Sequence, residues 1–418
     1  MTSPASEAAL TVPSVRVRVP FLLTLSLANL GLMLAFFTPI QNLLPRLSEQ
    51  IAGADGKEAA LAWVTGVGAF VAIVANPLAG ALSDRTTSRF GRRRPWILLG
   101  ALIGAVMIAL LSTQTTVVGL AVLWGLGQAA VNAAYSALTA AIPDQVPVPQ
   151  RGAASGWVGM SQTLGVVLGV ALVSFVITGL AGGTFLTGLL LVVLVIPFLV
   201  VLNDSRLAKA DRPPFHLGQF VRDFWVSPRK HPDFAWAWAA RFLVSLGSAM
   251  ATLYLLFFLQ DRVGQPQAEA AQSQTVLIAL YAVGTMVTAV IGGIVSDRSG
   301  RRKVYVIGAS IVMACAALLL VGTTTMQMAM VAALILGLGY GAYLAVDQAL
   351  ITQVLPRADD RARDLGVINI ANSAPQVLGP VIAAALVTSF GGYPALYAVT
   401  AVITLLGAAA VIPIRSVR

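Results

Sequence analysis

The chain has few charged residues. Only 11% of its 418 residues are Asp, Glu, Lys or Arg, whereas 57% are hydrophobic. A water-soluble domain of this size needs more polar side chains than this to cover its surface. The composition therefore excludes a soluble globular protein, and the thickness of a bilayer sets the length of the structural elements instead.

Residues that hold metals and carry out covalent chemistry are also scarce. The single cysteine, Cys315, excludes an intrachain disulfide, and its place in an apolar run predicts a small packing residue. No cluster of His, Cys and carboxylate residues has the spacing of a metal site. No glycine-rich loop followed by lysine is present to hold a nucleotide phosphate. We therefore expect no metal, no cofactor and no enzymatic activity.

What the chain does contain is a series of long apolar runs. A transmembrane helix needs roughly 20 apolar residues, and the sequence has twelve segments of about this length. These segments predict an all-α integral membrane protein. They run at about 20–44, 59–83, 96–112, 117–142, 152–179, 183–203, 234–260, 270–296, 304–322, 327–354, 364–389 and 393–413.

The basic residues are distributed unevenly between the loops. With the N-terminus inside, most of the 27 Lys and Arg residues fall on the inner side, and the outer loops hold only Arg46, Lys57 and Arg262. This asymmetry predicts a multi-pass protein of the plasma membrane whose termini and central loop are cytoplasmic. The net charge of +10 therefore suits an anionic bilayer surface rather than nucleic acid.

The chain divides into two similar halves. A charged, proline-rich linker at 204–233 separates bundles of six helices at 20–203 and 234–414, and residues 1–19 form a cytoplasmic tail without a cleavage pattern. The Ser-Asp-Arg sequence at 83–85 recurs at 296–298. A parallel repeat of six helices is one of the symmetries of secondary transporters, whose substrates bind near the middle of the membrane.

The repeated sequence lies between the second and third spans of each half. An acidic residue here can pair with arginines or face a helix N-terminus, and such contacts can close the inner side in one state and break in another. The alternative is a topology anchor, in which the arginines only hold the loop inside. The candidate gating residues are Asp84, Arg85, Arg89, Arg92 and Arg93, with Asp297, Arg298, Arg301 and Arg302 in the second half.

The stretch 83–96, Ser-Asp-Arg-Thr-Thr-Ser-Arg-Phe-Gly-Arg-Arg-Arg-Pro-Trp, resembles the inter-helix signature of sucrose-transporter-like proteins and the looser one of glycoside–pentoside–hexuronide:cation symporters. The segment 364–376 resembles the penultimate-helix signature of sucrose transporters. Both groups belong to the major facilitator superfamily. The resemblance implies two six-helix bundles that alternate access to a cavity lined by helices one, four, seven and ten, and a functional monomer.

The same helices, and helix eleven, carry polar residues three or four positions apart. Such residues share one helix face, and polar groups within a bilayer face protein or water rather than lipid. Amides, hydroxyls and tyrosines suit a neutral, polyhydroxylated ligand, although hydrogen bonds between helices are the alternative role. The candidate substrate-binding residues are Gln128, Asn132, Tyr135, Ser245, Ser248, Tyr340, Tyr343, Asn372 and Gln376.

Arg241 and Asp347 are the only opposite charges placed well within predicted spans. At 1.5 Å per residue, each lies on the order of 10 Å from the cytoplasmic end of its helix. Charges at this depth are costly and usually pair with each other. We therefore expect an ion pair, with two alternative roles: coupling of transport to substrate or protons, or a static link between two helices.

The chain departs from the sucrose transporters at one informative place. Those proteins carry an acidic group three residues after the position of Trp124, where this chain has Gly127. Ion coupling through the first half is therefore in doubt, so either Asp347 couples transport to protons or transport is uncoupled. The sequence favours a secondary transporter of a sugar or glycoside. Efflux of an amphiphilic drug or metabolite, and a membrane sensor or scaffold that transports nothing, are the alternatives.

Overall fold

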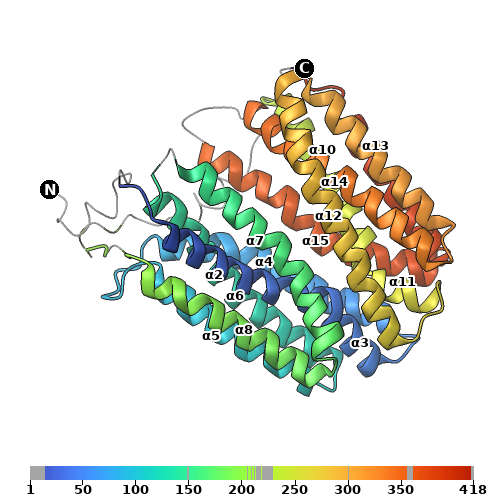
Figure 1. The fold of residues 1–418 in the computed structure, drawn as a ribbon, viewed down its shortest axis with the longest axis horizontal. Coiled ribbons are helices and arrows are strands. Elements are labelled where there is room, and N and C mark those ends of the chain that lie inside the picture. The colour runs from blue at the N-terminus through green and yellow to red at the C-terminus, as the bar shows by residue number, and fades with distance from the viewer. Residues whose placement is uncertain are drawn as a thin grey trace. The chain divides into compact units, whose positions relative to one another are not determined.

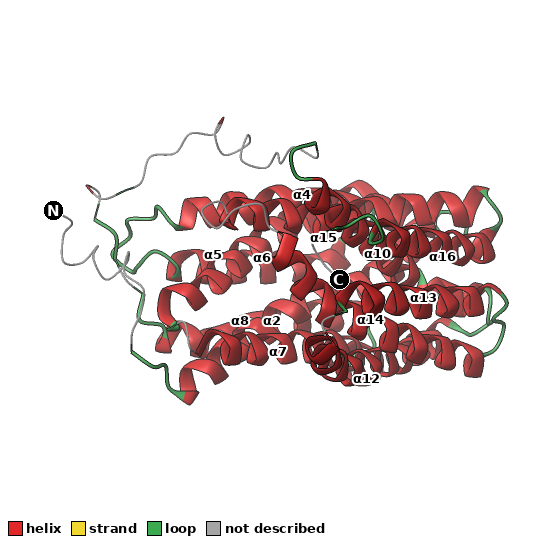
Figure 2. Ribbon diagram, turned by 90° about the horizontal axis from the view of Figure 1, so that it is seen from above, coloured by secondary structure: helices red, strands yellow, loops and turns green. Residues whose placement is uncertain are grey.

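The computed structural model describes residues 15–147, 150–204, 229–299, 301–354 and 361–415, and isolated positions between 206 and 218. Helices make up all the regular structure of these residues, and none of them forms a strand (Figure 2). The all-α membrane fold predicted from the sequence is confirmed. Most of the predicted linker at 204–233 lies outside the described residues.

Contacts divide the chain into two units. Unit 1 comprises Met1–Ala54 and Val67–Phe215, and unit 2 comprises Asp55–Gly66 and His216–Arg418. The helices that begin in the first half of the chain are, in order, α2 (Val19–Thr38), the π-helical η1 (Pro39–Leu43), α3 (Leu44–Ala52), α4 (Lys57–Ser83), α5 (Arg94–Ala109), the 3₁₀-helical η2 (Leu110–Thr113), α6 (Val117–Gln145), α7 (Arg151–Ala171), the π-helical η4 (Leu172–Val176) and α8 (Leu180–Val201). Figure 1 labels the larger of these helices along the chain.

The remaining helices belong to unit 2. They are α10 (Pro232–Leu253), α11 (Leu255–Asp261), α12 (Gln267–Ser299), α13 (Arg302–Val321), α14 (Met326–Val354), α15 (Arg361–Ser389) and α16 (Gly392–Ala410). Helix α4 is the one long helix that both units share, because its first ten residues group with unit 2 and the rest with unit 1.

The predicted spans correspond to these helices. Eleven described helices are long and apolar enough to cross a membrane, and the twelfth prediction coincides with α15, whose apolar part covers Ala374–Ser389. At two places the observed helices differ from the spans predicted from the sequence. The first span continues through η1 to Ala52, and the seventh is interrupted at Tyr254, between α10 and α11.

The prediction that Cys315 is a packing residue is wrong. Its side chain is exposed on α13, whereas Ala314 and Ala316 on either side are buried. Neighbouring residues on a helix point about 100° apart, and an apolar run inside a membrane protein does not reveal which of its faces is turned outward.

Both units pack their helices in the same pattern. In unit 1, α2 contacts α7 and α8, while α5 contacts α6 and α8. In unit 2, α10 contacts α15 and α16, while α13 contacts α14 and α16. Each pair in one unit corresponds to a pair in the other when the helices are numbered from the start of each half. The duplication read from the sequence is thus repeated in the packing.

Glycines allow the closest of these approaches. A Cβ on Gly100 of α5 would lie 2.5 Å from the carbonyl oxygen of Ala130 on α6. In unit 2, a Cβ on Gly337 of α14 would lie 2.2 Å from the carbonyl oxygen of Tyr281 on α12. Backbone atoms cannot move away from such a contact cheaply, so these positions depend on small residues, as is common between membrane helices.

Candidate functional site

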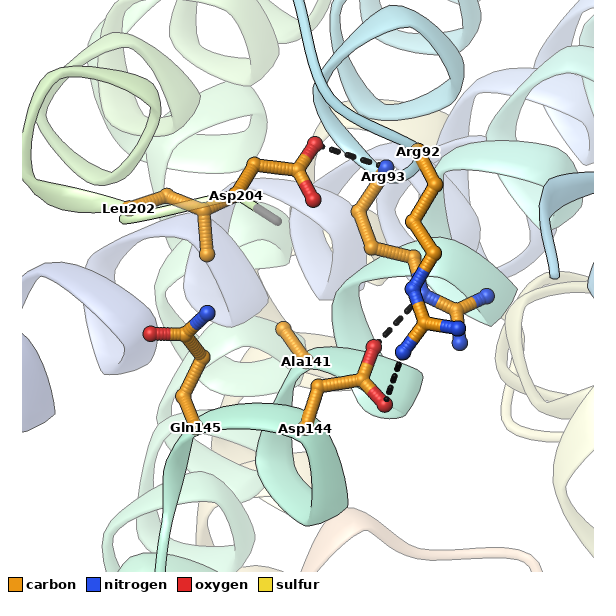
Figure 3. Close-up of a pocket in the computed structure, with 7 residues that line it drawn as sticks. All are labelled: Arg92, Arg93, Ala141, Asp144, Gln145, Leu202 and Asp204. Carbon is orange, nitrogen blue, oxygen red and sulfur yellow. Dashed lines mark hydrogen bonds and ion pairs between the residues drawn. The ribbon is translucent and has the colours of Figure 1, made fainter. Parts of the chain in front are cut away.

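The first candidate site is the arginine junction, the segment 83–94 that connects α4 to α5. The Arg93 guanidinium contacts Asp84, donates to the Ser83 hydroxyl at 2.5 Å and donates through Nε to Asp144 Oδ2 at 2.8 Å. Arg92 Nη2 lies 2.9 Å from the other carboxylate oxygen of Asp144. One acidic residue near the end of α6 thus holds two neighbouring arginines, and Figure 3 shows both guanidiniums turned toward it.

A second carboxylate, Asp204, caps α5 from the chain that follows α8. Its Oδ2 accepts the backbone N–H groups of Arg93 and Arg94, each at 2.7 Å. Those N–H groups have no partner within the helix, and the helix N-terminus favours negative charge. Burial raises the pKa of the Asp204 carboxyl above its ordinary value, and the N–H donors oppose that shift.

Gly91 makes this capping contact possible. Its φ of 97° lies in the left-handed region, and a Cβ there would stand 2.2 Å from Asp204 Oδ2. Only glycine combines that backbone conformation with so close an approach. The turn before α5 is therefore built around the carboxylate of Asp204.

Arg93 is the buried centre of the junction. Its side chain is 4% exposed, and although burial lowers its pKa, the carboxylates of Asp144 and Asp84 raise the pKa above the ordinary value for arginine. The guanidinium is thus a permanent charge that depends on two carboxylates. All the junction partners described here belong to unit 1.

The other predicted gating residues are placed differently. Arg85 is buried, whereas Arg89 is exposed and its guanidinium lies 4.8 Å from the ring centre of Phe90. In the second half, Arg301 is exposed and Arg302 begins α13. The side chains of Asp297 and Arg298 lie outside the described residues.

The sequence reasoning missed Asp144 and Asp204. A signal for both was present, because each is an acidic residue at the same end of the helices as the arginine junction. Counting basic residues to orient the chain gave these acids no weight, since topology depends mainly on Lys and Arg.

The second candidate site lies in unit 2, between α10 and α14. Arg241 Nη1 lies 3.3 Å from Asp347 Oδ2, and both side chains are about 5% exposed or less. The expected ion pair is therefore confirmed, whereas a coupling role stays a prediction. The Asp347 carboxylate and the Tyr343 hydroxyl are both buried, and the two side chains interact with each other.

Tyr340 and Tyr343 lie next to this ion pair, and Tyr281 extends them into a series of three tyrosines. The rings of Tyr340 and Tyr343 on α14 stack at a centroid distance of 6.4 Å, and Tyr281 on α12 stacks on Tyr340 at 5.8 Å. Tyr281 was not among the residues singled out from the sequence. The helix periodicity shows which residues share a face of α14, but not which residue of another helix faces them.

The polar residues of α6 mainly bond one another. Asn132 Nδ2 donates to Gln128 Oε1 at 2.9 Å, and Asn76 Nδ2 on α4 donates to Asn132 Oδ1 at 3.4 Å. The ring of Tyr135 meets Phe36 of α2 edge to face at 5.8 Å. One of these hydrogen bonds thus stays within α6 and the other joins α4 to α6, and substrate binding by these residues stays a prediction.

The remaining candidates are partly described. Ser245 and Ser248 are half-buried on α10, and Gln376 is exposed on α15. The side chain of Asn372 lies outside the described residues. No group of three or more His, Cys, Asp or Glu residues in the described ranges could hold a metal ion.

Comparison with known proteins gives a consistent result. A model of the Major Facilitator Superfamily matches residues 21–273 and 267–417. A general alpha-glucoside permease of Schizosaccharomyces pombe is 29% identical over 168 residues, which cover 36% of this chain and 30% of the permease. The chain thus aligns with less than a third of the length of this relative.

Solved structures share the fold at low sequence identity. The nucleoside transporter NupG superposes with a TM-score of 0.72 over 95% of this chain and 99% of its own, at 14% identity. A POT family transporter in complex with a thioalcohol-conjugated peptide reaches a TM-score of 0.74 over 94% and 95%, at 12% identity. At sequence identities this low, the similarity shows a shared fold and nothing more.

Proposed function

Because this chain belongs to the Major Facilitator Superfamily, a family of membrane transporters, we propose that it moves a small neutral solute, a sugar or glycoside, across the membrane by alternating access. The local similarity to an alpha-glucoside permease supports this substrate class. So does the resemblance of the junction and of helix eleven to sucrose-transporter signatures.

The observation that carries the proposal is the buried polar group around Asp347. An ionisable residue within a membrane helix marks a functional site by default, since its burial is costly. Here Asp347 and Tyr343 are both buried and interact with each other, and the ion pair of Asp347 with Arg241 is long, at 3.3 Å. A sugar hydroxyl both donates and accepts, so it can satisfy the two groups together.

Proton coupling belongs to the same site. With Arg241 beside it, Asp347 can carry its charge while paired, or take up a proton when the pair separates. Substrate that competes for either partner would then link binding to protonation. The uncoupled alternative is a static ion pair that only joins α10 to α14.

The wider arrangement is part of the proposal. We assign residues 20–203 and 234–414 to the two moving bundles, joined by a cytoplasmic linker, in a monomer of the plasma membrane with both termini inside. The concentration of Lys and Arg on one side supports this orientation.

Efflux of an aromatic or amphiphilic solute is the second candidate. The stacked series of Tyr281, Tyr340 and Tyr343 favours it, because flat rings bind well to aromatic faces. A sensor or scaffold without transport is the third reading, and it predicts no flux of any solute.

Purified protein in proteoliposomes distinguishes these functions. We expect uptake of a radiolabelled alpha-glucoside, with accumulation against its gradient when a pH difference is imposed and equilibration if transport is uncoupled. Uptake of aromatic amphiphiles without sugars would favour efflux, and no flux in the whole panel would contradict transport.

A matched pair of variants tests the site itself. Tyr343→Phe removes the hydroxyl beside Asp347, whereas Tyr397→Phe removes a buried hydroxyl on α16 that has no hydrogen-bond partner in the described structure. One lost hydrogen bond costs about 0.5–1.5 kcal/mol. The first variant should therefore weaken sugar binding by up to about tenfold, and the second should leave it unchanged. Equal affinities in both variants would remove Tyr343 from the site.

A further inference from the structure

A compact cluster of polar and aromatic residues lies at the other end of α4 from the arginine junction. Its centre is Lys57, the first residue of this 27-residue helix. A helix of that length spans about 40 Å, so this cluster and the junction stand at opposite ends of α4. Neither the gating residues nor the proposed substrate site includes it.

Lys57 is buried and fully engaged. It is 4% exposed, its ammonium lies 2.6 Å from Asp261 Oδ1, and it stands 4.9 Å from the ring centre of Phe257. Asp261 accepts a second hydrogen bond on Oδ2, from the Tyr393 hydroxyl at 2.7 Å. Because the ammonium of Lys57 is buried, it is poorly solvated. Its positive charge is therefore stabilised mainly by these partners, since a buried charge without compensation is costly.

The backbone of the same turn is held as well. The hydroxyl of the fully buried Tyr254 lies 3.0 Å from the carbonyl oxygen of Glu58 and 3.2 Å from that of Pro380 on α15. Tyr254 occupies the break between α10 and α11, and Asp261 ends α11. The first turn of α4 is thus attached to α11 and the break before it, and through their shared partners to α15 and α16 of the same unit.

The rest of α4 is attached to unit 1. A Cβ on Gly68 would lie 2.2 Å from the Trp124 side chain on α6, and Asn76 hydrogen-bonds Asn132 on the same helix. One continuous helix therefore has its beginning in one unit and its body in the other. Whenever the two units move relative to each other, either this attachment at Lys57 opens or α4 bends.

We propose that Lys57, Asp261 and Tyr393 form a clasp that holds the first turn of α4 in unit 2 and opens during each transport cycle, so that its strength sets the balance between the two states. The burial of Lys57 makes the clasp close to all-or-none. Once the ammonium separates from the carboxylate, both groups are better solvated in water than left apart in the protein. The inference depends on family membership and on no particular substrate.

Distance measurements between spin labels test the clasp. In a Cys315→Ser background, which removes the only cysteine, labels at Asp55→Cys, two residues before Lys57, and at Glu269→Cys, in the first turn of α12, report whether the start of α4 stays with unit 2. Both positions are exposed. We expect a dominant short distance in the otherwise unchanged protein, and at least a tenfold increase in the ratio of long to short distances in Lys57→Met.

Two further variants sharpen the result. Arg262→Met removes a neighbouring exposed cation and should leave the distances unchanged. Asp261→Asn weakens the ion pair from its more exposed side, so it tests the proposal even if Lys57→Met cannot be purified, and it should also lengthen the distance. Distances that are the same in all variants, or that lengthen equally in Arg262→Met, would overturn the proposal. The measurement needs no substrate, so an error in the assigned sugar would not affect it.

Discussion

Replacing Arg93 by glutamine should destabilise unit 1 through the arginine junction. The side chain is 4% exposed and contacts Asp84, 53% exposed, and Asp144, 20% exposed. Removing one partner of a fully buried ion pair costs about 3–5 kcal/mol. Because both carboxylates are partly solvated, we expect a smaller loss, about 2–4 kcal/mol, in the free energy of unfolding.

Thermal unfolding in detergent measures this loss. For a unit of about 200 residues, each kcal/mol lowers Tm by about 2–4 °C, which predicts a decrease of about 4–16 °C. Arg89→Gln is the matched control, since Arg89 belongs to the same loop but is exposed and contacts Phe90 instead of an acid in the described structure. Equal Tm values for the two variants would refute the reasoning that the Arg93 contacts stabilise the unit.

Three other substitutions give independent tests. Gly91→Ala should lower Tm more than Gly53→Ala, because both have positive φ but only the first meets a carboxylate within 2.2 Å; equal shifts would leave backbone strain as the whole effect. Asp347→Asn should abolish the dependence of uptake on an imposed pH difference, and an unchanged dependence in proteoliposomes would eliminate this residue as the coupling site. Gly337→Val should greatly reduce the yield of folded protein in size-exclusion chromatography, whereas Gly308→Val, with open space around its Cβ, should be tolerated; similar yields would contradict the close approach of α14 to α12.

The fold could be predicted from the sequence because the bilayer imposes a simple rule. A helix must stay apolar for about 20 residues, so the spans appear directly as hydrophobic runs. The rule fails at the ends of spans. The extension of the first span to Ala52 and the break at Tyr254 depend on tertiary contacts, and the Tyr254 hydroxyl bonds carbonyl groups far away in the sequence.

The candidate sites were predictable to different degrees. The Arg241–Asp347 pair could be expected because a helix rises by a fixed distance per residue, so depth can be compared between helices. The partners of Arg93 could be expected only in part: Asp144 and Asp204 belong to the same end of the helices as the junction, but the local pattern does not show that they approach the same turn. Contacts between distant helices require the packing itself, and the packing depends on shape as well as periodicity.

The central claim, alternating-access transport of a sugar, is tested most directly by counterflow. Proteoliposomes are loaded with an unlabelled alpha-glucoside and diluted into a trace of the same labelled compound, with no ion gradient present. A transporter with one site open to either side in turn predicts a transient accumulation of label inside, which disappears when the vesicles are loaded with buffer alone. The absence of accumulation with any sugar in correctly folded protein would contradict the account.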